Sequence, residues 1–374
     1  MTPEILRTEA LAQISRLVKQ GDGAVERDTI FAVIQRDING FDIETEISPV
    51  DLRLLRVQLY CDTLRNFRIA SSIIREGGLD EASVLSVVQG RQELLRSVPA
   101  YFEVQITETM TQVPSYLPYE KLGVTPLTKG REMTLEQYRS LTGEISALSG
   151  DAVVNLSFAG EPAAHSAVYG FVEETLRHEG LDVLLETSGI GWKDDMLESL
   201  ARLPQNRMTW IVDLDASTKE LYESLRGPGW DEAQAFCDRL IGLFPGRVHV
   251  QAVRMQENEA DLESFYRYWK ERASNVIIQK YDWYSGYLPQ RKVTDLSPLR
   301  RLPCWHLKRD MIILVDGTVA MCREDLERKH ILGNVFNEPL ADVWSKGESY
   351  YRLHVKEDYP EICKGCDEYY TYNF

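Results

Sequence analysis

Long apolar stretches are missing from this 374-residue sequence, and so is an excess of positive charge. No segment approaches the roughly 20 consecutive apolar residues of a membrane-spanning helix. Residues 1–20 contain acidic side chains and lack the apolar block of a signal peptide. Asp and Glu number 58 against 42 Lys and Arg, and the resulting formal charge of −16 disfavours binding to nucleic acid or to an anionic membrane. We therefore expect a soluble cytoplasmic protein that binds neither.

Cysteine is scarce, and its distribution is uneven. The chain has six cysteines, and none of them lies between Cys61 and Cys237. Six thiols are too few for a disulfide scaffold in a chain of this length, so reduced thiols are expected. Cys61 and Cys237 fall in apolar helical patterns, which predicts that both pack in a core. The remaining four lie close to the C-terminus: Cys304, Cys322, Cys363 and Cys366.

The four C-terminal cysteines have a spacing typical of a thiolate metal site. Cys304 and Cys322 flank a strand–turn–strand pattern that turns at Asp316-Gly317, and Cys363 and Cys366 form a C-x2-C pair. Two separated thiols and one such pair can converge on a single tetrahedral site. Because thiolates suit iron and zinc alike, the spacing alone leaves an iron–sulfur cluster and a structural zinc ion as alternatives.

The texture of the sequence divides the chain into three parts. Residues 1–98 carry apolar side chains at helical spacing, with one helix around residues 6–18, a second from Ser48-Pro49 to Gly77-Gly78 and a third over 79–95. We predict a helical N-terminal region at 1–98, a β/α domain at 99–290, and a linker with a cysteine module at 291–374. The N-terminal region contains no motif that indicates chemistry.

The middle part alternates short apolar strands with amphipathic helices. One helix is expected to start at Thr134, with Gln137 completing a capping box, and another at Asn258. Six β/α units in this span predict a parallel α/β sheet, doubly wound or curled into a partial barrel, with ligands at the carboxyl ends of the strands. The strand candidates are residues 101–107, 152–159, 182–187, 208–215, 247–254 and 275–280.

The C-terminal part resembles a SPASM domain, the auxiliary iron–sulfur module of many radical S-adenosylmethionine enzymes. The matching features are Cys304, then Gly317 followed by Cys322, then LGNVFNEPLADVW, then the C-x2-C pair. No cysteine follows Cys366, so this module supplies ligands for one cluster and not two. The resemblance implies one 4Fe–4S cluster held by the four cysteines and favours it over zinc.

The middle part resembles the radical S-adenosylmethionine barrel. FAGEPAAH (158–165) is similar to the family's Gly-Gly-Glu-Pro motif, LLETSG (184–189) to the end of its third strand, and LRGPGW (225–230) to the loop after its fourth strand. The resemblance implies a partial (β/α)6 TIM-like barrel. It also implies that S-adenosylmethionine, if bound, contacts four residues: Gly160, Glu161, Pro162 and Ser188.

One departure from the family pattern lies after the first strand. Relatives carry C-x3-C-x2-C there, because three thiolates hold the cluster that cleaves the cofactor. The corresponding positions here are Met110, Pro114 and Leu117, and these side chains cannot replace three thiolates. A cysteine-less barrel with an intact cysteine module resembles the group called spiro-SPASM proteins, which implies that the catalytic cluster is absent.

Three functions remain open on the sequence. The first is a non-radical or non-catalytic iron–sulfur protein, with a peptide or protein as the partner that the resemblance implies. The second is an enzyme that modifies a peptide or binds S-adenosylmethionine without radical chemistry. The third is a zinc-stapled interaction scaffold. Binding of an iron–sulfur cluster or of a zinc ion can stabilise the fold of a small module. We favour such a structural role for the four C-terminal cysteines.

Overall fold

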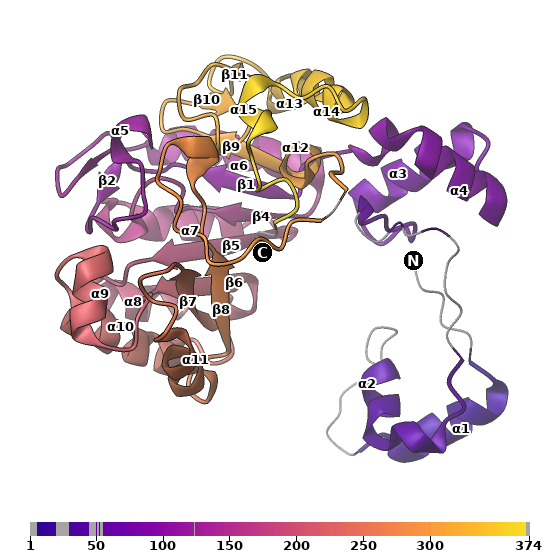
Figure 1. Cartoon of the computed structure of the whole chain (residues 1–374), viewed down its shortest axis with the longest axis horizontal. Coiled ribbons are helices and arrows are strands. Elements are labelled where there is room, and N and C mark those ends of the chain that lie inside the picture. The colour runs from indigo at the N-terminus through magenta and orange to yellow at the C-terminus, as the bar shows by residue number, and fades with distance from the viewer. Residues whose placement is uncertain are drawn as a thin grey trace. The chain divides into compact units, whose positions relative to one another are not determined.

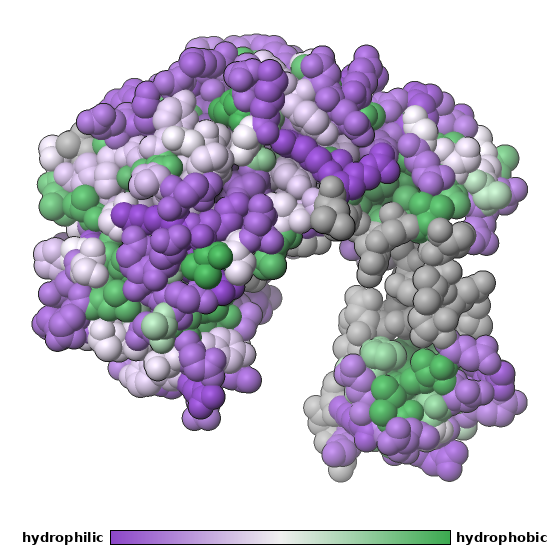
Figure 2. Space-filling view, viewed as in Figure 1, coloured by the Kyte–Doolittle hydropathy of each residue, from purple (hydrophilic) through white to green (hydrophobic). Residues whose placement is uncertain are grey.

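The computed structural model describes residues 6–19, 30–44, 50, 52, 55–122, 124–298 and 300–371. The chain forms two compact units, residues 1–58 and 59–374 (Figure 1). The first unit contains helices α1 (Thr8–Leu17) and α2 (Ile30–Ile34) and the 3-10 turn η2 (Gln35–Gly40). Its small core consists of Ile14, Val33 and Ile34. Hydrophobic side chains also reach its surface (Figure 2), and those exposed are Leu11, Phe31, Ile38 and Ile43.

The second unit begins with helices α3 (Leu64–Arg75) and α4 (Glu81–Gly90) and the turn η4 (Gln92–Leu95). Helix α3 starts at the Thr63 side chain, whose oxygen accepts a hydrogen bond from the backbone N–H of Asn66 at 3.2 Å. The prediction of one helix from Ser48 onward is therefore wrong for residues 56–63, which are not helical. The predicted start at residues 48 and 49 lies outside the described residues. Cys61 is exposed in the turn before α3, so its predicted core packing is also wrong.

A curved sheet forms the centre of the second unit, and all six predicted strands are present in it. They pair in parallel in the order β1-β4-β5-β6-β7-β8. Their bounds are β1 (Tyr101–Val104), β4 (Ala152–Asn155), β5 (Leu181–Thr187), β6 (Met208–Asp213), β7 (Val248–Arg254) and β8 (Asn275–Lys280). The α/β class and the partial barrel predicted from the sequence are confirmed.

Helices connect these strands and cover one face of the sheet (Figure 1). They are α6 (Leu135–Ser149), α7 (Val168–Leu176), α8 (Asp194–Leu200), α9 (Lys219–Arg226), α10 (Trp230–Leu243) and α11 (Leu262–Lys270). The predicted capping box of Thr134 and Gln137 is present at the start of α6. Helix α11 begins at Leu262 and not at Asn258, because the Asn258 side chain instead donates to the backbone carbonyls of Asp215 and Val253. Cys237 is buried in α10, as predicted.

Smaller elements complete the barrel part of the unit. They are β2 (Thr109–Met110), α5 (Tyr119–Leu122), β3 (Thr125–Pro126), and the 3-10 turns η5 (Pro162–Ala164), η6 (Gln205–Arg207) and η7 (Tyr284–Gly286). The turn η7 follows β8 within the predicted β/α domain, and Tyr284 packs there against Leu122 and Val124 of the barrel. No helix in the described part of the chain is long and apolar enough to cross a membrane.

Strand alternation separates the core of the sheet from its inner face. Along β6, Trp210 and Val212 are fully buried in the main hydrophobic cluster under the helices, whereas Ile211 and Asp213 point to the other side. The same alternation in β5 places Leu185 in the core and Glu186 on the inner face. The inner face is therefore where polar side chains gather.

The cysteine-containing part of the chain extends the same sheet. Strand β9 (Asp310–Ile313) pairs in parallel with β1, and β10 (Thr318–Ala320) and β11 (Ile331–Asn334) follow antiparallel. The predicted hairpin is confirmed, and its Gly317 has a φ of 81°, a conformation that favours glycine. The helices here are α12 (Trp305–Arg309), α13 (Leu340–Lys346), α14 (Glu348–Val355) and α15 (Glu361–Lys364). The proposed boundaries at 98/99 and 290/291 stay a prediction.

Candidate functional site

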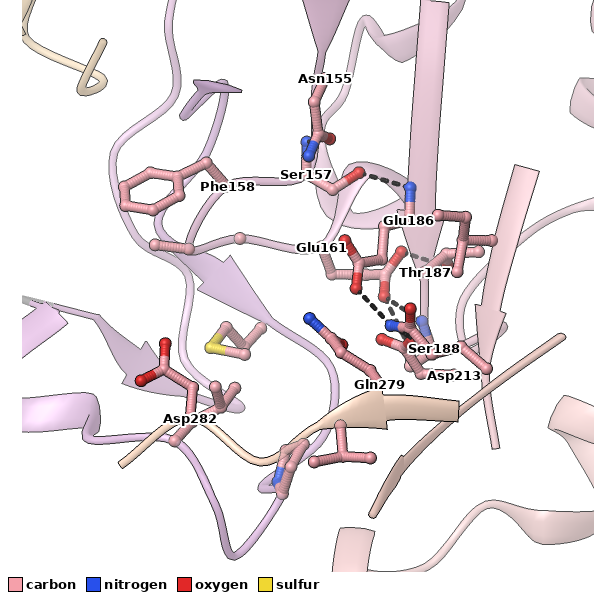
Figure 3. Close-up of a pocket in the computed structure, with 18 of the residues that line it drawn as sticks. Asn155, Ser157, Phe158, Glu161, Glu186, Thr187, Ser188, Asp213, Gln279 and Asp282 are labelled. Atoms are coloured by element: carbon pink, nitrogen blue, oxygen red, sulfur yellow. Dashed lines mark hydrogen bonds between the residues drawn. The ribbon is translucent and has the colours of Figure 1, made fainter. Parts of the chain in front are cut away.

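A cavity of about 210 Å³ opens at the carboxyl ends of the parallel strands (Figure 3). Each of the six parallel strands β1, β4, β5, β6, β7 and β8 contributes to its lining, as do the segments that follow them. In parallel α/β sheets this edge is where ligands bind, so the cavity occupies the position that the strand pattern predicted.

Glu161 is the most fully hydrogen-bonded side chain of the cavity. Its carboxylate accepts from the Thr187 hydroxyl at 2.6 Å, from the Ser188 hydroxyl at 2.7 Å and from the Ser188 N–H at 2.9 Å. Figure 3 shows this group gathered where β5 ends. Burial raises the pKa of Glu161, and the hydroxyl and N–H donors act against that rise.

A close approach between two loops fixes the position of Glu161. The Glu161 N–H donates to the carbonyl of Thr109 at 2.8 Å, and Ala159 has a φ of 47°. A Cβ atom on Gly160 would lie 1.9 Å from the carbonyl oxygen of Thr107. Glycine is therefore required at position 160 for this loop to lie against the segment after β1.

The four residues predicted to contact a cofactor do not all reach the cavity. Gly160, Glu161 and Ser188 line it. Pro162 is buried as the first residue of η5 and is not part of the lining. Its contribution is to start the turn that follows Glu161.

The three positions aligned with the family's missing cysteines all line this cavity. Met110, Pro114 and Leu117 face it from the segment after β1. Met110 and Leu117 also pack in an apolar cluster with Leu122 and Ala159. Met110 is therefore a packing residue as well as part of the lining. The segment is folded against this cavity and contains no cysteine.

Two backbone hydrogen bonds hold the same segment to α9. The N–H of Val113 donates to the carbonyl of Arg226 at 3.3 Å, and the N–H of Ser115 donates to the carbonyl of Leu225 at 2.7 Å. The segment is therefore bound to the C-terminal end of α9.

A buried ion pair reinforces this attachment. The Arg226 guanidinium donates to the Asp215 carboxylate at 2.6 Å, to the Tyr116 hydroxyl at 2.5 Å and to Gln112 Oε1 at 3.1 Å. Tyr116 donates to the same carboxylate at 2.5 Å, and the Val253 N–H donates to its other oxygen at 2.7 Å. Sequence patterns do not identify Arg226 and Tyr116 as site residues, because their hydrogen-bond partners come from separate loops.

Glu186 and Asp213 form a second polar group on the inner face. The Gln251 side-chain amide donates to both, at 2.8 Å to Glu186 and 2.9 Å to Asp213. Burial and the neighbouring Glu186 carboxylate raise the pKa of Asp213 well above its ordinary value, although Arg226 acts in the opposite direction. Glu186 and Gln251 were missed from the sequence; their signal was a polar residue in an otherwise apolar strand.

The C-terminal cysteines lie together in a second place. Cys304, Cys322 and Cys363 share a small hydrophobic core with Leu307 and Tyr351. Cys366 lies nearby and accepts a hydrogen bond from the N–H of Glu368 at 3.3 Å. Burial raises the pKa of Cys304 to about 12 and that of Cys363 to about 11, and the pKa values of the other two thiols are also raised.

This donor set fits an iron–sulfur cluster. Four thiols from three elements enclose one core, and an N–H group already donates to one sulfur, as backbone donors do around such clusters. In the described part of the chain, no three Cys, His, Asp or Glu side chains are gathered into a site ready for a single ion. When bound, a cluster supplies one-electron chemistry or a covalent cross-link between the elements that hold its ligands.

Comparisons with known proteins concern the cysteine-containing part and the whole chain. The family model of SPASM, an iron–sulfur cluster-binding domain, matches residues 304–367. An uncharacterized protein of Treponema pallidum (strain Nichols) is 39% identical over 358 residues, covering 92% of this chain and 98% of that protein.

Solved structures share the fold at low sequence identity. SuiB of Streptococcus suis bound to precursor peptide SuiA superimposes with a TM-score of 0.56 and 13% identity, over 86% of this chain and 76% of that chain. Native anSMEcpe with bound AdoMet and the Cp18Cys peptide superimposes with a TM-score of 0.52 and 13% identity. This match covers 73% of this chain and 87% of that chain. The chain therefore contains a SPASM-type iron–sulfur cluster-binding domain, shares the fold of these structures, and belongs to one family with the Treponema pallidum protein.

Proposed function

We propose that this protein carries one 4Fe–4S cluster, held by Cys304, Cys322, Cys363 and Cys366, and that its barrel has lost the ligands of a catalytic cluster. In this account the barrel binds a peptide or protein partner without radical chemistry. The cytoplasm suits this function, since a reducing compartment keeps the four thiols free for iron.

The observation that carries the proposal is the segment after β1. Met110, Pro114 and Leu117 line the cavity where thiolates would be needed, and none of them is an iron ligand. Arg226 and Asp215 hold this segment in place through a buried ion pair. Because none of these three side chains is a thiolate, a cluster there would lack its three cysteine ligands.

The match to the SPASM model supports a cluster over zinc. Four thiolates suit a tetrahedral zinc ion and a cubic 4Fe–4S cluster alike, so the core that the cysteines share fits both metals. The match of residues 304–367 to an iron–sulfur cluster-binding domain is what favours iron.

A peptide is the partner class that the structural neighbours suggest. SuiB was solved with a precursor peptide and anSMEcpe with the Cp18Cys peptide. Both share this fold, and the cavity described above lies at the carboxyl ends of the strands, where such folds bind ligands. The acidic net charge argues against nucleic acid and anionic membranes as partners.

Binding of S-adenosylmethionine without radical chemistry is the second candidate. Gly160 and Glu161 keep the loop that holds this cofactor in the family, which favours it. Against it, Thr187 and Ser188 already occupy the Glu161 carboxylate, and a cavity of 210 Å³ is below the roughly 300–1,000 Å³ of most small-molecule pockets. Methyl transfer to a peptide, or release of 5′-deoxyadenosine, would select this candidate.

Metal analysis of anaerobically purified protein tests the proposal. We expect about four irons and four sulfides per chain, with no S-adenosylmethionine cleavage after reduction. About eight irons would contradict the loss of the barrel cluster. Zinc without iron would contradict the 4Fe–4S assignment and favour a zinc-stapled scaffold.

A further inference from the structure

The lining of the barrel cavity carries more acidic than basic groups. Five carboxyl side chains line it: Glu103, Glu161, Glu186, Asp213 and Asp282. The basic side chains of the lining are Arg226, Lys280 and Arg323. The balance of charge therefore depends on which carboxylates these three cations already serve.

Each of the three cations already pairs with a carboxylate, and two of these carboxylates lie outside the lining. Arg226 pairs with Asp215, which lies outside the lining, and its other contact with a carboxylate is 3.8 Å long, to Asp213. Lys280 pairs with Glu368, also outside the lining. The remaining cation, Arg323, lies 3.7 Å from Glu103 and is also attracted by Asp282. These commitments leave the Glu186 side of the cavity negative.

Glu186 and Asp213 share a neutral partner. Their hydrogen bonds come from the single amide group of Gln251, which spaces the two carboxylates without neutralising either. An organic cation with several N–H donors fits this arrangement.

Apolar side chains stand beside this acidic pair. Leu184, Ile211 and Ile277 line the cavity next to it, on the same inner face of the sheet. An ammonium or guanidinium on an unbranched hydrocarbon stem matches such a lining, because the stem packs on apolar surface while the charge meets the carboxylates. The volume of 210 Å³ suits one long side chain better than a whole nucleoside.

The cavity is bounded on one side by the last strand of the sheet. Ile277 and Gln279 of β8 line it, and β8 pairs only with β7 among the described strands. Figure 3 shows Gln279 pointing toward the Glu161 group. A side chain that enters beside an open strand edge can belong to a peptide whose backbone stays outside.

We propose that the cavity binds the basic side chain of a peptide, a lysine or an arginine, with its charge between Glu186 and Asp213. This inference rests on the proposed function, in which the barrel binds a peptide, and it names the residue type that the barrel selects.

Ligand-observed NMR on the full-length iron-loaded protein tests this inference. The probes are Nα-acetyl amides of lysine, arginine, Nε-acetyl-lysine and norleucine, which separate the charge from the length of the stem. We expect the lysine or arginine probe to bind at least about tenfold more tightly than the two neutral probes, which corresponds to about 1.4 kcal/mol. Glu186→Gln and Asp213→Asn should each lose most of this preference.

A matched variant and a competitor complete the design. Glu263→Gln removes an exposed carboxylate on α11, away from the lining, and should leave the preference unchanged. Equal binding of norleucine and lysine would overturn the inference, and so would loss of the preference in Glu263→Gln. Displacement of the lysine probe by S-adenosylmethionine at lower concentration would assign the cavity to that cofactor and would also overturn it.

The iron content of the same samples distinguishes failure of this inference from failure of the proposed function. Four irons per chain with no preference for charged probes would refute only the inference that the cavity binds a basic side chain. Eight irons, or zinc, would refute the proposed function whatever the probes show. Unchanged iron content and thermal unfolding in Glu186→Gln would show that a lost preference does not come from misfolding.

Discussion

Arg226 and Asp215 form a fully buried ion pair, 2.6 Å between Nη1 and Oδ2, that joins the end of α9 to the end of β6. Tyr116 hydrogen-bonds to both partners and so brings the segment after β1 into the same network. In this protein a side-chain network organises a segment that in its relatives carries cluster ligands.

Removing one partner of this pair should be costly. In Arg226→Met the Asp215 carboxylate keeps its bonds from Tyr116 and Val253 but loses its only cation among the described contacts. We expect a loss of about 3–5 kcal/mol in the free energy of unfolding, measured by chemical denaturation.

An exposed pair gives the matched control for that variant. Lys219 and Asp231 are joined at 2.6 Å but are 45% and 80% exposed, so Lys219→Met should cost well under about 1 kcal/mol. If both methionine variants unfold alike, the Arg226 network does not organise the barrel mouth.

Gly160→Ala should displace the loop that holds Glu161. The added Cβ would meet the Thr107 carbonyl oxygen at 1.9 Å, so the loop must move and the bonds from Ser188 should break. We expect lower thermal stability and weaker binding of the basic probes. Gly242→Ala is the control, since no atom lies within 4 Å of its added Cβ in α10, and it should be neutral or stabilising by about 0.5–1 kcal/mol.

The ionised Asp213 carboxylate should lower the stability of the folded protein while it strengthens binding of a basic side chain. Its folded-state pKa is raised by burial and by Glu186, with Asp215 acting in the same direction and Arg226 against it. A raised pKa means that the stability contributed by the protonated form is complete below the ordinary value of 3.8 and is lost as the pH rises through the folded-state pKa.

Asp213→Asn should therefore unfold at a higher temperature than the unmodified protein at pH 7.5, and the gap should narrow as the pH is lowered toward 4. Binding of the capped lysine probe should weaken over the same fall in pH, because protonation removes one carboxylate. Differential scanning fluorimetry across this range measures the first effect. A lower melting temperature of Asp213→Asn at pH 7.5 would contradict the strain assigned to this carboxylate.

The helical segment 59–98 should be needed for the cysteine module. Arg96 donates to the carbonyls of Leu307 and Trp344 at 3.0 and 2.8 Å and stacks 3.6 Å from the Trp344 ring centroid, while the Trp344 indole donates to the Ser97 carbonyl at 2.7 Å. Hydrogen bonds from a charged donor are worth about 1.5–3 kcal/mol. A chain that starts at Leu59 should fold and bind iron, whereas one that starts after Val98 should not.

Expression of the two truncated chains with iron determination measures this difference. Loss of iron in the chain that starts at Leu59 would show that the first unit is required as well. Iron binding by the shorter chain would show that residues 59–98 form a separable domain, in line with the boundary predicted from the sequence.

The sequence predicted the strands and the hairpin well because both depend on local patterns. Alternation of apolar residues identified all six parallel strands, and Asp316-Gly317 identified the turn. The helix that was expected from Ser48 shows the limit of periodicity, since the Thr63 cap decides where α3 begins. Local spacing therefore predicted which segments form strands and helices, but it did not predict the residue at which a helix begins.

The candidate site was predicted only where a motif marked it. Glu161 and Ser188 were found through the family resemblance, and the structure brings them into contact at 2.7 Å. Arg226 was missed because its role depends on a left-handed backbone at Asp215, with a φ of 62°, which turns that carboxylate inward. Glu186 was missed because only the folded sheet shows which strand face lines a cavity.

The central claim is one cluster in the cysteine module and none in the barrel. Iron and sulfide determination on anaerobically purified protein, with the double variant Cys363→Ser/Cys366→Ser and the control Cys61→Ser/Cys237→Ser, tests it most directly. We predict about four irons and four sulfides in the unmodified protein and in the control, and loss of both in the first variant. About four irons remaining in Cys363→Ser/Cys366→Ser would place a cluster elsewhere and contradict the account.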